Sequence, residues 1–206
     1  MNEEKELRRI AIFCGSSLGA DPVFAQQAYY LGQAIARRGS GIVYGGAHVG
    51  LMGEVARGVL DEEGEVIGVI PEFLQKKELA HNGITQNYIV STMHERKAKM
   101  EELCDGVIAL PGGYGTMDEL FEILTWAQLS LHKKPIGLLN VEGFYDPLIE
   151  MSEKMIEKKF VKPEYRKLWI IDDNIERLLD RMNVFEPLKN DKWFVTSINA
   201  LENKTL

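Results

Sequence analysis

Short apolar runs alternate with longer segments of helical periodicity along most of the 206-residue chain. The apolar runs predict β-strands at about residues 10–13, 41–44, 66–70, 88–92, 106–110, 134–140 and 169–171. Apolar residues at helical spacing predict helices at about 22–38, 51–61, 93–103, 116–131, 145–159 and 174–182. This alternation predicts an α/β fold, a Rossmann-like parallel sheet with helices on both faces.

A chain of this length with 45% hydrophobic residues can bury one full core, so we expect a single domain. We assign residues 1–188 to it. Residues 189–206 are predicted to form a C-terminal tail, for which the sequence leaves docking and disorder open. Residues 72–87 form a polar segment that predicts a loop with a helical turn, and a loop of this length is often functional.

A glycine-rich turn follows the predicted strand at 106–110. It reads Pro-Gly-Gly-Tyr-Gly-Thr from Pro111 to Thr116, and helical spacing resumes near Thr116, which we predict to be the N-cap. Glycine lets the backbone approach an anion closely, and the amino end of a helix offers unpaired N–H groups and the positive end of its dipole. The turn therefore predicts a phosphate-binding cradle.

The same residues allow a second interpretation. Thr116 and Glu119 have the Thr-x-x-Glu spacing of a capping box, in which the glutamate reaches back to the cap N–H. Capping alone requires neither the proline nor three glycines. A carboxylate in the first turn also repels a bound phosphate unless it points elsewhere. A sugar phosphate would remove that conflict, because its reacting carbon lies away from its phosphate.

An arginine lies in the apolar stripe of the helix predicted at 93–103. Met93, Arg96, Met100 and Leu103 share one face of that helix. A buried guanidinium needs an anion. A bound phosphate or Glu119 would be its partner, because this helix begins one strand away from the glycine turn. A purely structural ion pair in the core is the alternative.

Two further glycine loops follow the first and second predicted strands. The first is Gly15-Ser16-Ser17, and the second contains Gly45-Gly46 and Gly50-Leu51-Met52-Gly53. Loops at neighbouring strand ends can face one ligand from two sides, although tight packing of a helix on a sheet also selects glycine. Neither loop has the GxGxxG spacing of a dinucleotide site, so we expect no NAD site.

Charge and composition narrow the function further. The net charge of −7 argues against a nucleic-acid partner, because binding many phosphates needs a basic face. The four histidines show no metal-ligand spacing, and we expect neither a metal nor another cofactor. No apolar run has membrane-spanning length and no signal-like segment opens the sequence. Cys14 and Cys104 lie in apolar surroundings typical of reduced thiols, which favours a cytoplasmic protein.

Together these motifs resemble the LOG ("Lonely Guy") family of cytokinin riboside 5′-monophosphate phosphoribohydrolases, many of which carry the label possible lysine decarboxylase. The resemblance spans residues 8–186. It rests on the PGGxGTxxE signature at 111–119, on both earlier glycine loops, on Met-His-Glu-Arg-Lys at 93–97 and on Thr-Trp-Ala-Gln-Leu at 125–129. It implies hydrolysis of the N-glycosidic bond of a nucleoside 5′-monophosphate, a cytokinin riboside 5′-monophosphate or AMP, to free base and ribose 5-phosphate. No lysine has a setting that suggests a pyridoxal Schiff base.

The resemblance also implies the site residues. Arg96 and Glu119 are the expected catalytic pair. The carboxylate would stabilise an oxocarbenium-like state, and the arginine, which cannot act as an acid at ordinary pH, would orient it and hold phosphate or sugar. The expected substrate-binding residues are Gly45, Gly46, Glu78, Met93, Lys97, Gly112, Gly113, Tyr114, Gly115, Thr116 and Thr125.

A non-catalytic nucleotide or cofactor carrier is the alternative function. Molybdenum cofactor carrier proteins resemble this fold and its glycine loop. The presence of both Arg96 and Glu119 favours the enzyme, because a carrier has little reason to place a carboxylate beside a phosphate.

The assembly expected from the sequence is a homodimer. Phe121, Trp126 and Leu129 lie off the main apolar stripe of the helix predicted at 116–131. A monomer would leave part of this apolar area in water. We therefore expect this helix, or the helix at 93–103, to form the contact, as in the simplest members of the family.

Overall fold

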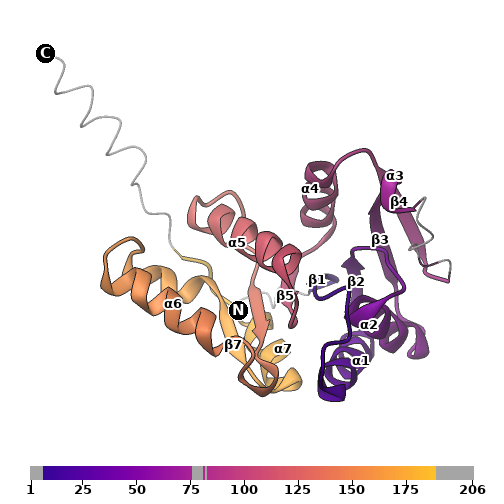
Figure 1. The fold of residues 1–206 in the computed structure, drawn as a ribbon, viewed down its shortest axis with the longest axis horizontal. Helices are drawn as coiled ribbons and strands as arrows, with labels where there is room; N and C mark the ends of the chain where they lie inside the picture. Colours follow the sequence, from indigo (N-terminus) through magenta and orange to yellow (C-terminus); the bar gives the residue numbers. More distant parts are fainter. Residues whose placement is uncertain (1–6, 76–80, 82, 189–206) are drawn as a thin grey trace, which may run out of the picture.

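A seven-stranded parallel sheet forms the middle layer of the protein (Figure 1). The structure, a computed structural model, describes residues 7–75, 81 and 83–188. The strands lie in the order β4-β3-β2-β1-β5-β6-β7 and all neighbouring pairs are parallel. Their bounds are β1 (Arg9–Phe13), β2 (Gly41–Tyr44), β3 (Val66–Pro71), β4 (Gln86–Val90), β5 (Gly106–Ala109), β6 (Ile136–Leu139) and β7 (Ile170–Asp172).

Helices cover both faces of the sheet. On one face lie α1 (Pro22–Arg37), α2 (Gly50–Asp61) and α7 (Ile175–Asn183), and on the other lie α4 (Met93–Leu103), α5 (Tyr114–Gln128) and α6 (Asp146–Glu157). The short elements are α3 (Glu72–Gln75), η1 (Val141–Gly143) and η2 (Pro163–Leu168). The α/β fold predicted from the sequence is confirmed.

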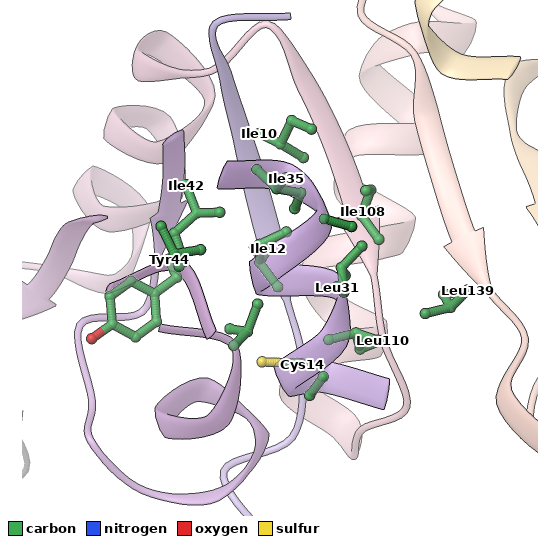
Figure 2. Packing of buried hydrophobic residues seen from close by; sticks show 14 of the residues in the cluster. Ile10, Ile12, Cys14, Leu31, Ile35, Ile42, Tyr44, Ile108, Leu110 and Leu139 are labelled. Carbon is green, nitrogen blue, oxygen red and sulfur yellow. The ribbon is translucent and has the colours of Figure 1, made fainter. Parts of the chain in front are cut away.

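The central strand β1 shows how one short apolar run serves two cores. Ile10 and Ile12 pack in the cluster beneath α1, α2 and α7, of which Figure 2 shows a part. Ala11 and Phe13 point the other way, into the cluster beneath α4, α5 and α6. Successive side chains of a strand point to opposite faces, so a strand covered on both sides must be apolar throughout.

Several predicted boundaries shift. β4 ends at Val90, two residues before the predicted end, because the next two residues serve the start of α4. The Thr92 hydroxyl accepts a hydrogen bond from the Glu95 N–H (3.1 Å), and the Glu95 carboxylate accepts one from the Ser91 N–H (2.8 Å). The helix predicted at 116–131 begins two residues earlier and ends at Gln128, and Ser130 beyond it has a left-handed φ of 59°.

Some sequence-based predictions fall on the remaining parts of the chain. The tail predicted at 189–206 lies outside the described residues. Within the described ranges, none of the helices combines the length and apolar character needed to cross a membrane. Cys14 and Cys104 are buried and free, in agreement with their predicted apolar surroundings.

Candidate active site

A cavity of about 380 Å³ opens at the carboxyl ends of the central strands. The loops after β1 and β2, the end of β3, Arg96 of α4 and the first turns of α5 line it. Strand order reverses between β1 and β5, and the crevice beyond such a reversal is where doubly wound folds bind ligands. The predicted glycine loops therefore meet at one place.

Arg96 and Glu119 form a buried ion pair in this cavity. Arg96 Nη1 lies 3.1 Å from Glu119 Oε1, with 12% and 9% of the two side-chain surfaces exposed. Arg96 Nε also donates a hydrogen bond to the Val69 carbonyl (3.2 Å). Burial raises the pKa of Glu119, and the positive charge of Arg96 opposes that rise. Of the two predicted partners for the arginine, the structure shows the carboxylate.

Gly45 leaves the space that the arginine occupies. A Cβ atom on Gly45 would lie 2.4 Å from Arg96 Nη2 and 2.9 Å from the Met52 sulfur. Gly46 has a different role: its φ of +75° is left-handed, and it is not among the described residues that line the cavity. The loop after β2 therefore shapes the site through Gly45, whereas Gly46 shapes the loop itself.

Glycines of the turn before α5 differ in what surrounds them. A Cβ atom on Gly112 would lie 2.2 Å from Thr116 Oγ1 and 2.8 Å from the Gly15 nitrogen. A Cβ atom on Gly113 or Gly115 would have no neighbour within 4 Å. Both of the latter glycines line the cavity. Packing explains the glycine at 112, and open space lies beside the backbone at 113 and 115.

The prediction that Thr116 caps the helix was wrong. The N-cap is Gly113, whose extended backbone makes no side-chain cap bond, so Thr116 lies buried in the first turn and lines the cavity. Glu119 therefore has no capping partner at Thr116 and turns toward Arg96. Tyr114, with 96% of its surface exposed, stands at the mouth of the cavity. The amino end of α5 therefore opens on the cavity, and the N–H groups of a first helical turn have no intrahelical partners.

Backbone hydrogen bonds fix the three loops to one another. The Gly15 N–H donates to the Pro111 carbonyl (3.0 Å), and the Gly15 carbonyl accepts from the Leu51 N–H (3.0 Å). The buried Tyr145 hydroxyl donates to the Leu110 carbonyl (2.5 Å), immediately before the glycine turn. The loop after β1 therefore lies between the other two and holds them in place.

Besides Gly46 and Gly112, three predicted substrate-binding residues do not line the cavity, and a further one is not described. Lys97 contacts carboxylates on α5. The Thr125 hydroxyl donates to the Phe121 carbonyl (2.7 Å), and Thr125 lines a separate groove. Met93 is exposed. None of these three is among the described residues that line the cavity. Glu78 lies outside the described residues.

Sequence reasoning missed one side of the cavity. Met52, Ile70 and Leu74 form an apolar wall, and Cys14 and Ser16 line the end of β1. Burial raises the pKa of the Cys14 thiol well above its ordinary value, which disfavours the reactive thiolate form. The available signal was positional, because each of these residues follows the carboxyl end of a strand or lies at it. Their residue types alone indicated only core packing.

Comparison with known proteins supports the family resemblance that the sequence motifs indicate. Residues 52–182 match the family described as "Possible lysine decarboxylase". A probable cytokinin riboside 5′-monophosphate phosphoribohydrolase LOGL1 of Oryza sativa subsp. japonica is 47% identical over 177 residues, which cover 86% of this chain and 79% of the relative. The cytokinin riboside 5′-monophosphate phosphoribohydrolase LOG7 of Arabidopsis thaliana is 42% identical over 188 residues, covering 91% and 87%. This chain belongs to the LOG family.

The LOG-family fold is also found in solved structures of other proteins. A molybdenum cofactor binding protein from Rippkaea orientalis has a TM-score of 0.65 and 23% identity, over 85% of this chain and 95% of that chain. The molybdenum cofactor carrier protein of Chlamydomonas reinhardtii has a TM-score of 0.65 and 18% identity, over 87% and 98%. At these identities the likeness shows the fold alone.

Proposed function

We propose that this protein hydrolyses the N-glycosidic bond of a nucleoside 5′-monophosphate, releasing the free base and ribose 5-phosphate. Cytokinin riboside 5′-monophosphates and AMP are the substrates that the resemblance implies, and the names of the relatives support this class. The observation that carries the proposal is the buried ion pair of Arg96 and Glu119 beside an open glycine turn at a helix amino end.

Each part of the cavity has a task in this reaction. The substrate phosphate binds at Gly113, Gly115 and Thr116, where backbone N–H groups and the helix dipole favour an anion. The apolar wall of Met52, Ile70 and Leu74 suits the base. Glu119 then faces the ribose between them. Its carboxylate stabilises the positive charge that develops at the anomeric carbon and positions the attacking water.

Arg96 holds the carboxylate in place rather than donating a proton. A guanidinium stays protonated at any ordinary pH, so it cannot serve as the general acid. Its contacts with Glu119 and the Val69 carbonyl fix the orientation of the pair. In the reaction the bond between the base nitrogen and the anomeric carbon breaks, the water oxygen bonds to that carbon, and a water proton passes to the base.

The family description names a different reaction, which this cavity does not suit. Pyridoxal-dependent decarboxylation of lysine uses a lysine amine of the enzyme to form a Schiff base. None of the described lining residues is lysine. The neighbouring Lys97 is already held by two carboxylates. The residues favour glycoside hydrolysis over decarboxylation.

The test of the proposed function is release of free base from AMP and from isopentenyladenosine monophosphate.

The mechanism is tested by Glu119→Gln. This variant should lower kcat by about 10²-fold or more, which is the loss expected when one electrostatic stabiliser is removed. Its binding of AMP should persist or tighten, because a charge that repels the phosphate has gone. Glu150→Gln, on the exposed surface of α6, is the matched control and should keep full activity. A folded Glu119→Gln protein with normal turnover would contradict the mechanism. AMP bound without cleavage by the wild type would favour the carrier.

We also propose a homodimer that acts in the cytoplasm without an added cofactor. Large apolar side chains are exposed along α5 and at its end, including Phe121, Leu129 and Leu131, beside an apolar groove of about 220 Å³ between α5, α6 and η2. An exposed apolar area of this kind is typical of a protein contact. The two buried free thiols suit a reducing compartment.

A further inference from the structure

Two adjacent cations of α4 reach the same helix. Arg96 contacts Glu119 inside the cavity. Lys97 Nζ lies 3.1 Å from Asp118 Oδ2 and 3.0 Å from Glu122 Oε2, two residues of α5 that are not among the described residues lining the cavity. Positions 118 and 122 are one helical turn apart and so lie on the same face. The lysine therefore bridges two carboxylates that flank the catalytic one.

The Lys97 side chain is held by its ion pairs with Asp118 and Glu122. Only 11% of it is exposed, and Lys97 is not among the described residues lining the cavity. Burial alone would lower its pKa, but hydrogen bonds from its ammonium to Glu122 and Asp118 raise the pKa above the ordinary value. A lysine held in this way keeps its charge and has little freedom to reach a ligand in the cavity.

Asp118, Glu119 and Glu122 are three carboxylates within little more than one turn of α5. Without the charge of Lys97, two of them would lose the cation that neutralises them. Like charges at this spacing repel one another and disfavour ionisation of the most buried member. Asp118 and Glu122 both act to raise the pKa of Glu119, whereas Arg96 and Lys97 act to lower it. The charged groups with the largest effect on Glu119 are Arg96, Asp118, Lys97 and Glu122, and the thiol of Cys14 lies near enough to be affected by Glu119.

We propose that Lys97 is a positioning residue for Glu119, which neutralises Asp118 and Glu122 and fixes α5 against α4, and that it does not hold the substrate phosphate. This inference rests on the proposed function, in which Glu119 must be ionised and must face the anomeric carbon. It changes the role of Lys97 from a substrate ligand to the residue that protects the charge of the catalytic carboxylate.

The kinetic test compares Lys97→Gln, which removes the charge, with Lys97→Arg, which keeps it. For Lys97→Gln the acid limb of the kcat/KM profile should move up by about one pH unit, because an uncompensated pair of carboxylates disfavours ionised Glu119. At neutral pH kcat should fall about tenfold while KM changes less than about threefold, because phosphate contacts remain. Lys97→Arg should retain the wild-type profile.

A second variant keeps the inference testable if Lys97→Gln folds poorly. The triple variant Lys97→Gln, Asp118→Asn, Glu122→Gln removes the lysine together with the charges it neutralises, and its acid limb should return to the wild-type position. Two results would overturn the inference. One is an unmoved acid limb with only a lower Tm. The other is a tenfold weaker affinity for ribose 5-phosphate with an unmoved acid limb, which would assign Lys97 to the phosphate.

A readout without turnover separates this inference from the proposed function. In protein labelled with carboxyl-¹³C glutamate, the Glu119 resonance can be assigned by its loss in Glu119→Gln. Its titration midpoint should lie higher in Lys97→Gln than in the wild type. An unchanged midpoint would refute the role of Lys97 even in an active enzyme. Wild-type protein that releases no base would refute the proposed function and leave the midpoint comparison standing.

Discussion

Glycines 112, 113 and 115 have the same residue type and different reasons for it. At Gly112 a side chain would collide with Thr116 and with the backbone of Gly15. At Gly113 and Gly115 the protein itself leaves room for one, and neither has a left-handed φ. The fold therefore requires the first glycine, whereas the phosphate site that we propose would account for the other two.

This difference gives a prediction at the residue scale. Gly113→Ala and Gly115→Ala should fold with a Tm close to that of the wild type, because the added methyl group meets no protein atom. Each should weaken ribose 5-phosphate binding about tenfold or more, since the methyl group occupies the space of the phosphate. Gly112→Ala should instead lose about 1–3 kcal/mol of stability through overpacking. Calorimetric binding and thermal unfolding measure both effects. Unchanged affinity in both of the first two variants would place the phosphate elsewhere.

The sequence predicted the roles of individual site residues less well than it predicted where the site lies. The chain contains Thr-x-x-Glu at 92–95 and again at 116–119. The first forms cap contacts at α4, and the second does not, because Gly113 starts α5 earlier. Local spacing is the same in both cases. Only the position of Arg96, brought in by another helix, gives Glu119 a different partner.

At the scale of elements, we expect the stability of the junction between β7 and α7 to depend on pH. Asp172 lies buried at the end of β7, and Arg177 and Arg181 of α7 contact it. Burial alone would raise the pKa of Asp172, but hydrogen bonds from Arg177, the Asn174 N–H and Arg181 lower it to about 2. A lowered carboxyl pKa means that the ionised group stabilises the fold above its ordinary pKa and loses this effect as the pH falls toward the folded-state value.

We therefore predict a loss of stability between about pH 4 and pH 2 that depends on Asp172. Asp172→Asn should be less stable than the wild type by about 1 kcal/mol at pH 7, a modest value because both arginines are half-exposed, and the difference should shrink at pH 2. The exposed neighbour variant Asp173→Asn is the control and should change little. Denaturant unfolding at the two pH values measures this. A difference between Asp172→Asn and wild type that persists at pH 2 would contradict the prediction.

Elements were predicted better than residues, for a physical reason. Strands buried on both faces, such as β2, must be apolar throughout, so the apolar run marks their limits directly. The edge strand β4 is mostly exposed, and its apolar residues did not mark where pairing begins. Register with β3, which starts at Gln86, sets its limits instead. The sequence of a segment does not by itself show where it pairs with a neighbouring strand.

At the scale of the whole molecule, the predicted assembly can be tested through α5. Phe121→Lys would place a charge in the apolar groove proposed as the dimer contact. The wild type should have twice the 23.3 kDa mass of one chain in light scattering at micromolar concentration, and Phe121→Lys should have the mass of one chain. Tyr30→Lys, on α1 at the opposite face of the sheet, is the control and should remain dimeric. A wild-type mass of 23.3 kDa would refute the dimer.

The hydrogen bonds of Gly15 also have a consequence for folding. They join Leu51 and Pro111, so the cradle exists only after β1, β2 and β5 have come together. We therefore expect a nucleotide to bind the chain in which these three strands are assembled, and its binding to stabilise that state by mass action. We expect the amide hydrogens of Gly15 and Leu51 to exchange only through global unfolding, and added ribose 5-phosphate to slow exchange across the sheet. Exchange of these two amides well before those of β1 would contradict this. Substrate supply would then set the lifetime of the folded enzyme as well as its rate of turnover.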